Sequence, residues 1–160
     1  MCLNVLNLTT PAEEIPLAGH PTIATTYALV DSRRLRLSGE RTTITLELQV
    51  GPIPVEIYAP NGKIEHITMT QKKPQFLRIY DPAEVLPAFN LNTEDALPGA
   101  PIQTVSTGTP QIMIPLRDQA ALRRASLDVA AYTTLRQQAD FFSPHLFCLG
   151  GVTPKGKTFA

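Results

Sequence analysis

One stretch of the sequence decides the fold, 43-TITLELQVGPIPVEIYAPNGKIEHITM-69. Apolar and polar residues alternate without interruption over residues 43–50, which is the period of a half-buried β-strand. The alternation returns over residues 55–58, and residues 64–69 form a third, less regular strand. Turn residues separate these segments, namely Gly51-Pro52 and Pro60-Asn61-Gly62. The pattern predicts an antiparallel meander of three strands.

A helix is expected ahead of this meander. Pro21 suits the first turn of a helix, because its missing N–H would have no intrahelical partner there. The following residues, Thr22 to Val30, are apolar on nearly every side, which predicts a buried helix. Leu3 to Leu8 is expected to form a short strand. A sheet that wraps the helix would bury both elements.

The character of the sequence changes near residues 71–75, where we expect a lobe boundary. Residues 1–74 would form most of an N-terminal lobe, and residues 75–160 the first part of a C-terminal lobe. In the second lobe, Asp81-Pro82 predicts a short helix with an acidic start, and Thr107-Gly108-Thr109-Pro110 predicts a turn between two strands.

The rest of the second lobe is expected to end in helices and a strand. Two helices are predicted over residues 118–124 and 128–138, with Ser126 as the cap of the second helix. A last strand is predicted over residues 146–149, ending at Gly150-Gly151.

The composition is sufficient for a folded core, and the charges are balanced. Of 160 residues, 43% are hydrophobic and 18% are charged, as in globular domains. Fourteen Lys and Arg balance fourteen Asp and Glu, so no nucleic-acid partner is expected. No apolar run approaches the roughly 20 residues of a membrane helix, and no signal peptide is recognised. Cys2 and Cys148 form no metal-binding spacing and fit a reducing compartment, so we expect a cytoplasmic protein.

His20 is the most suggestive residue for function. It lies between Gly19 and Pro21 at the expected helix start, where unpaired N–H groups and the helix dipole attract anions. Gly19 would let a ligand approach the backbone closely. An imidazole beside such a site can exchange a proton or orient a carboxylate. The alternative is that His20 only caps the helix and bonds to a turn carbonyl.

The other candidate groups carry weaker signals. Glu13-Glu14 could pair with His20, although adjacent carboxylates in a loop are more often solvated. His66 and His145 have no partner at a recognisable spacing, so no metal site is expected. A structural role is favoured for His66, and His145 is expected in a turn. Cys148 lies in an apolar segment, where a thiol is usually inert.

Several segments, in order along the chain, resemble the PhzF-like family, which is named for the phenazine-biosynthesis isomerase. Glu14-Ile15-Pro16-Leu17-Ala18-Gly19-His20-Pro21-Thr22 looks like the family's signature ahead of its first buried helix. Met69-Thr70-Gln71-Lys72-Lys73-Pro74 resembles the end of its first lobe. Val105-Ser106-Thr107-Gly108-Thr109-Pro110, running into Met113-Ile114-Pro115-Leu116, resembles a hairpin of its second lobe.

The resemblance implies an α+β chain of the diaminopimelate-epimerase-like class. Each of two lobes would be a mostly antiparallel sheet curled around a central helix, incomplete here, with a small-molecule site in the cleft between the lobes. Gly19 and His20 match family residues that face this cleft. The glycine N–H helps to hold a substrate carboxylate, and the histidine is a site residue near the proton-transfer acid.

These matches predict an isomerase or epimerase that works by acid/base proton transfer without a cofactor. Its partner would be a small carboxylate-bearing metabolite, with Gly19 and His20 as substrate-binding residues and His20 as a catalytic residue. A positioned general acid contributes roughly 10²–10⁴-fold to a rate.

The sequence also departs from the family pattern at both ends. The family's catalytic glutamate lies ahead of the strand that residues 3–8 match, and no residue here corresponds to it. An Asp-Pro-Ala-Thr-Gly-Ser-like motif, which opens the second lobe's central helix, has no match either. We therefore expect impaired catalysis by a chain that looks truncated. The alternative is a non-catalytic remnant or subunit that binds a small anion or a protein partner. Unfilled lobe interiors would favour a homodimer or a complementing chain.

Overall fold

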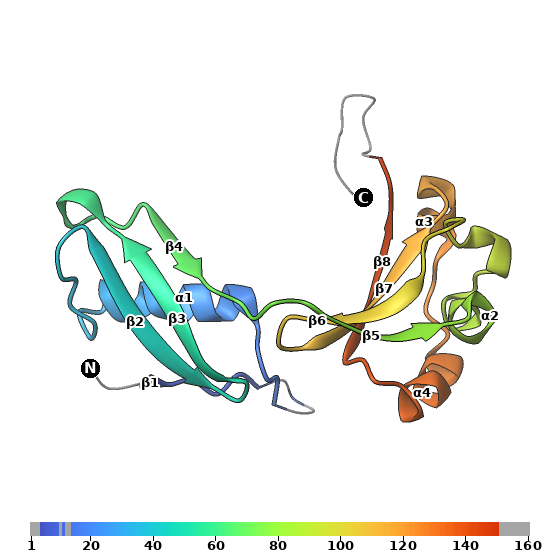
Figure 1. Ribbon diagram of the computed structural model, residues 1–160, viewed down its shortest axis with the longest axis horizontal. Coiled ribbons are helices and arrows are strands. Elements are labelled where there is room, and N and C mark those ends of the chain that lie inside the picture. The colour runs from blue at the N-terminus through green and yellow to red at the C-terminus, as the bar shows by residue number, and fades with distance from the viewer. Residues whose placement is uncertain (1–3, 10, 12–13, 151–160) are drawn as a thin grey trace. The chain divides into compact units, whose positions relative to one another are not determined.

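The computed structural model describes residues 4–9, 11 and 14–150 and has an α+β architecture, as predicted (Figure 1). The chain divides into two compact units, with the boundary between Lys73 and Pro74. Each unit is built on one four-stranded sheet. None of the helices in the described part combines the length and apolarity that crossing a bilayer requires.

The first unit is a sheet in the order β1-β2-β3-β4 with helix α1 (Gly19–Asp31) on one face (Figure 1). Strand β1 (Asn4–Val5) pairs in parallel with β2 (Arg41–Leu48). Strands β2, β3 (Gly51–Tyr58) and β4 (His66–Met69) pair antiparallel, with a short 3₁₀ turn at Pro60–Gly62. The meander predicted from the alternating residues is therefore present.

The alternation along β3 fixes which face of this sheet is buried. Ile53, Val55 and Ile57 are at most 2% exposed, and the register places Ile67 and Met69 of β4 beside Ile57 and Val55. Residues directly opposite one another in a ladder share a face. Ile67 and Met69 therefore lie on the buried face, and His66 and Thr68 lie on the other.

The strand boundaries of this unit differ from those expected. Only Asn4–Val5 of the predicted first strand is β-structure among the described residues, and Leu8 instead buries its side chain beside Leu17. The hairpin turn is formed by Gln49-Val50 rather than by Gly51-Pro52, because Leu48 pairs directly with Gly51. Gly51 has a φ of 100°, which glycine adopts without strain.

Helix α1 is not the fully buried helix that its composition predicted. It begins at Gly19, two residues before Pro21, and ends at Asp31. Its buried residues are Thr22 and Thr26, whose hydroxyls donate to the carbonyls of Ala18 (2.7 Å) and Thr22 (2.9 Å). Tyr27 is 52% exposed. The reason is that, among the described residues, a sheet covers only one side of a helix that is apolar on nearly every side.

The second unit is a sheet in the order β5-β6-β7-β8. Its strands are β5 (Gln75–Tyr80), β6 (Ile102–Ser106), β7 (Pro110–Leu116) and β8 (Ser143–Cys148); β8 runs parallel to β7 and the other pairs are antiparallel. The helices are α2 (Pro82–Val85), α3 (Gln119–Arg124) and α4 (Val129–Gln137), with 3₁₀ turns at Leu86–Phe89 and Thr93–Asp95.

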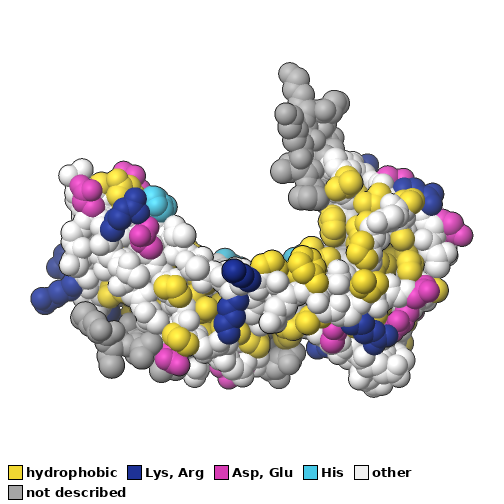
Figure 2. Space-filling view, in the orientation of Figure 1, with side chains coloured by type: hydrophobic (Ala, Val, Ile, Leu, Met, Phe, Trp, Pro, Cys, Tyr) yellow, Lys and Arg dark blue, Asp and Glu magenta, His cyan; other side chains and the backbone are white. Residues whose placement is uncertain are grey.

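These helices pack on the sheet around one core, in which Ile112, Ile114 and Leu116 of β7 are fully buried. Hydrophobic side chains also gather on the surface of this unit (Figure 2). The edge strand β5 leaves Phe76 69% and Ile79 63% exposed.

Two details of the second unit correct the expectations from sequence. The cap of α4 is Asp128, whose carboxylate accepts the Ala131 N–H at 3.0 Å, while the Ser126 N–H donates to the carbonyl of Phe89. The last strand is Ser143–Cys148. It includes His145, which was expected in a turn, and ends before Leu149.

Candidate functional site

The start of α1 offers backbone N–H groups to a ligand. Ala18 is the N-cap residue and has no side chain that could accept from the helix, and no acidic residue lies in the first turn. The first N–H groups of a helix have no intrahelical acceptor. Pro21 has no N–H, and the Thr22 N–H donates to the Ala18 carbonyl at 3.4 Å. The donors available at this helix end are therefore those of Gly19 and His20.

Gly19 borders side chains that come from β4 and the segment after it. A Cβ atom at position 19 would lie 3.8 Å from Gln71 Nε2 and 3.8 Å from Met69 Cε. These are ordinary van der Waals distances, and Gly19 does not have the positive φ that favours glycine. Neither the backbone nor the packing requires glycine here. What glycine leaves open is the approach to the helix N–H groups.

Gln71 is the residue at this site to which the sequence analysis gave no role. It belongs to residues 69–74, which resemble a family pattern, and no local pattern places its amide beside Gly19. The proximity arises because β4 runs next to α1, which brings residue 71 back to the helix start.

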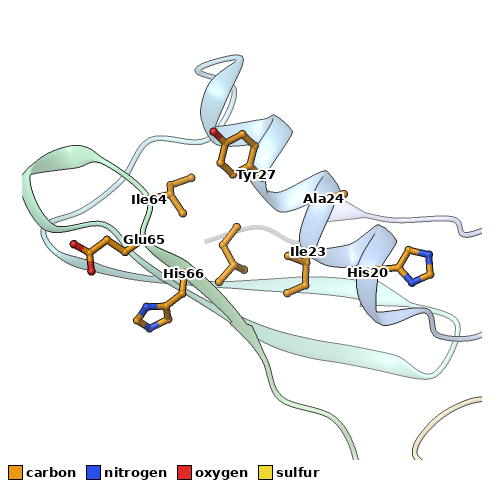
Figure 3. A pocket seen from close by; sticks show the side chains of 8 residues that line it. His20, Ile23, Ala24, Tyr27, Ile64, Glu65 and His66 are labelled. Carbon is orange, nitrogen blue, oxygen red and sulfur yellow. The ribbon is translucent and has the colours of Figure 1, made fainter. Parts of the chain in front are cut away.

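His20 is exposed at the same helix end. Figure 3 shows its ring pointing away from the other labelled side chains. Among the described residues, its ring forms neither an ion pair nor a hydrogen bond to a turn carbonyl. Glu14 is exposed and Glu13 lies outside the described residues. The pairing of His20 with Glu14 that was considered from sequence is therefore not formed.

An apolar groove of about 720 Å³ begins at His20 and follows the exposed face of α1 (Figure 3). Its walls are Ile23, Ala24 and Tyr27 of the helix and residues 64–67, which include the start of β4. The groove is the uncovered side of the helix described above, so its lining is apolar apart from His20, Glu65 and His66.

Of the remaining candidates from sequence, only His66 borders the groove, and its ring contacts another residue. The His66 ring stacks at 4.9 Å on Tyr58 on the outer face of the sheet, where Arg41 lies over the Tyr58 ring. His145 is exposed, and the Cys148 thiol is free and fully buried. No group of three or more His, Cys, Asp or Glu capable of holding a metal occurs within residues 4–9, 11 and 14–150.

The second unit contains a polar cluster around Asp140, in the loop between α4 and β8. Its carboxylate accepts hydrogen bonds from the hydroxyls of Thr104 (2.6 Å) and Tyr80 (2.7 Å) and from the Arg78 N–H (3.2 Å). Burial alone would raise the pKa of Asp140, but these hydrogen bonds outweigh it and hold the pKa below the ordinary value of 3.8. Burial also raises the pKa of Tyr80. The cluster ties β5 and β6 to the loop.

Comparison with known proteins identifies what this arrangement resembles. The family model described as phenazine biosynthesis-like protein, PhzC-PhzF, matches residues 6–147. The uncharacterized isomerase YddE of Salmonella typhimurium is 35% identical over 136 residues, which cover 81% of this chain and 43% of that protein. The trans-2,3-dihydro-3-hydroxyanthranilate isomerase of Pseudomonas aeruginosa is 28% identical over 117 residues, covering 73% of this chain and 38% of that protein.

The fold agrees with that of a solved relative. The crystal structure of the Bacillus anthracis phenazine biosynthesis protein of the PhzF family has a TM-score of 0.71 and 27% identity, and the match covers 94% of this chain and 50% of that one. The chain thus spans about half the length, or less, of the relatives it matches. Since the family model matches nearly the whole described chain and the fold agrees with it, the chain belongs to the phenazine biosynthesis-like family and has the predicted diaminopimelate-epimerase-like fold.

Proposed function

We propose that this chain supplies the carboxylate-binding part of a PhzF-like isomerase or epimerase. The reaction would move a proton on a small carboxylate-bearing metabolite by acid/base chemistry, without a cofactor. The observation that carries this proposal is the start of α1, where the Gly19 and His20 N–H groups have no capping side chain. Relatives that are named isomerases support the proposed reaction class.

In this proposal, the two oxygens of the carboxylate accept the N–H groups of Gly19 and His20. The helix dipole adds roughly 0.3–1 kcal/mol, and hydrogen bonds to a charged acceptor are about twice as strong as neutral ones. The Gln71 amide, which borders Gly19, helps to define how the carboxylate is oriented. A substrate whose carboxylate is bound in this way would have the carbon next to its carboxylate near the His20 ring.

His20 would orient the substrate or relay the proton. Isomerisation requires that one group takes a proton from carbon and that the same or another group returns it to a different position or face. An imidazole can do either near neutral pH.

A second candidate function is a non-catalytic subunit that binds a small anion. It is favoured by one observation: among the described residues, His20 has helix donors beside it but no carboxyl partner. The two functions share the binding site and differ in turnover. Conversion of a carboxylate substrate by the chain, abolished by His20→Ala, would favour the enzyme.

The binding step is tested by an NMR titration with 3-hydroxyanthranilate, following the Gly19 and His20 amide signals. The corresponding neutral carboxamide is the control ligand. We expect saturable shifts of both signals with the acid and little change with the amide. Gly19→Val should abolish binding, because its side chain fills the approach to the N–H groups. Gly19→Ala is the folding control, and His145→Ala, at an exposed histidine in β8, should bind normally. If other amide signals shift and saturate while those of Gly19 and His20 do not move, the ligand binds elsewhere on the chain.

A further inference from the structure

The groove along α1 begins at the proposed carboxylate site. It is lined by His20, whose N–H is one of the two proposed donors, and by residues that follow on the same face of the helix, Ile23, Ala24 and Tyr27. Positions 20, 23, 24 and 27 have the spacing of one helix face, so their side chains form a continuous row. At 1.5 Å per residue the row is about 10 Å long. A ligand whose carboxylate accepts the Gly19 and His20 N–H groups therefore has a largely apolar wall beside the rest of its structure.

Helix α1 directs Ile23 and Tyr27 into the groove rather than into the core. Its buried residues are Thr22 and Thr26, whose hydroxyls donate to backbone carbonyls one turn earlier. Tyr27 is 52% exposed, and Ile23 is half-buried. Single exposed apolar residues are normal on a protein surface, whereas a hollow lined by several of them marks a binding site. The row that lines the groove is therefore the side of α1 that is available to a ligand.

The opposite wall of the groove is also apolar and comes from Ile64 and Ile67. Figure 3 shows the Ile64 side chain across from the Tyr27 ring. The groove volume of about 720 Å³ lies within the roughly 300–1,000 Å³ of small-molecule sites, which are mostly apolar and use a few polar groups to fix the orientation of the ligand. An acid with a single ring would fill only part of this space. The volume therefore indicates a longer ligand.

A charged side chain borders the groove at the end away from His20. Figure 3 shows Glu65 next to Ile64 at this end. Glu65 is exposed and forms no ion pair within the described part of the chain. Its N–H donates to the Tyr58 carbonyl at 3.0 Å, which fixes the backbone at this position. An exposed carboxylate repels a second negative charge and attracts a positive one, by up to about fivefold in affinity. The far end of the groove therefore favours a neutral or positively charged group.

We propose that the substrate is a carboxylate with an elongated apolar body, which lies in the groove along α1 and reaches Tyr27. This substrate class rests on the proposed function, because the Gly19 and His20 N–H groups hold the carboxylate. Tyr27 is then a specificity-determining residue, whose ring contacts the far part of the body and takes no part in proton transfer. Glu65 selects against a second carboxylate at that end. Shorter acids bind the same donors and leave the groove unfilled.

The first test is an NMR titration of the full chain with acetate, butanoate, hexanoate and octanoate, following the Gly19 and His20 amide signals and the Tyr27 ring signals. Every acid should shift the two amide signals. The affinity should rise about twofold for each added methylene, because a methylene half covered in an open groove gains about half of the free energy of a buried one. Octanoate should therefore bind about 60-fold more tightly than acetate and should also shift the Tyr27 ring signals. The control ligand 1-octanol lacks the carboxylate and should bind at least about tenfold more weakly than octanoate.

The second test uses variants at the far end of the groove. Tyr27→Ser should weaken octanoate binding about fivefold or more and leave acetate binding unchanged, whereas Tyr27→Phe, which keeps the ring, should bind both as the unmodified chain does. Leu127→Ser, at a side chain of the second unit that is 53% exposed, is the matched control and should change neither affinity. The unmodified chain should prefer 8-aminooctanoate to octanedioate by about two- to fivefold, after allowance for the two equivalent ends of the diacid. Glu65→Gln should remove this preference.

The possible failures separate this substrate class from the proposed function. If all four acids shift the Gly19 and His20 signals with the same affinity, the carboxylate site stands and the elongated substrate is refuted. The same conclusion follows if Tyr27→Ser binds octanoate as the unmodified chain does, or if Glu65→Gln keeps the preference for the amine. If 1-octanol binds as tightly as octanoate, the groove is an apolar surface that does not use the carboxylate site. If no acid of any length moves the two amide signals, the proposed function fails, and this substrate class fails with it.

Discussion

Replacing Asp140 with alanine tests what holds the second unit together. The substitution removes a carboxylate that accepts hydrogen bonds from Thr104 (2.6 Å), Tyr80 (2.7 Å) and the Arg78 N–H (3.2 Å). Thr104 is fully buried, so its hydroxyl would be left without a partner, which costs about 1–3 kcal/mol. The Asp140 residue is itself exposed, and solvent screening reduces the charge contribution. We expect the free energy of unfolding to fall by about 2–3 kcal/mol.

Urea denaturation followed by circular dichroism measures this loss. Thr104→Val is the matched variant, because it removes the hydroxyl while keeping the shape of the side chain. In the double variant no hydroxyl is stranded at position 104, so the combined loss should be smaller than the sum of the single losses by about 1 kcal/mol. A loss below about 0.5 kcal/mol for Asp140→Ala, or strictly additive losses, would refute the structural role given to this cluster.

Three further outcomes are expected. Because folding lowers the Asp140 pKa, its contribution to stability is complete above the ordinary pKa and disappears as the pH falls through the lower folded-state value; Asp140→Asn should remove this part of the acid dependence in urea titrations. Asp128→Ala should cost about 1 kcal/mol by removing the α4 cap, whereas Ser126→Ala should stay within about 0.5 kcal/mol. Tyr27→Ser should change the free energy of unfolding in urea by less than about 1 kcal/mol, because Tyr27 is 52% exposed.

Local alternation was enough to predict the β2-β3-β4 meander of the first sheet, because burial on one face imposes a period of two on the residues. Ile53, Val55 and Ile57 obey that period and are buried. The hairpin turn lies two residues earlier than expected. The expectation was wrong because glycine is typical of turns, whereas Gly51 is the first residue of β3 and has a φ of 100°. Glycine marks a permissive backbone, and sequence alone does not say whether a turn or a strand end uses it.

What sequence could not predict depends on residues far apart in the chain. Apolar composition predicted that α1 would be buried, but burial depends on what covers the helix, and Tyr27 is 52% exposed. The Asp140 cluster joins residues about 36 and 60 positions apart. Gln71 reaches Gly19 only because β4 returns along the helix. The position of Gly19 and His20 at a helix start was predictable, because it follows from local sequence.

The central claim is that the start of α1 binds a carboxylate, and the most direct measurement is a crystal structure of the chain with 3-hydroxyanthranilate bound. The account predicts carboxylate oxygens at roughly 2.7–3.2 Å from the backbone nitrogens of Gly19 and His20. A carboxylate found only on surface lysine or arginine side chains, with both nitrogens bonded to water instead, would contradict it.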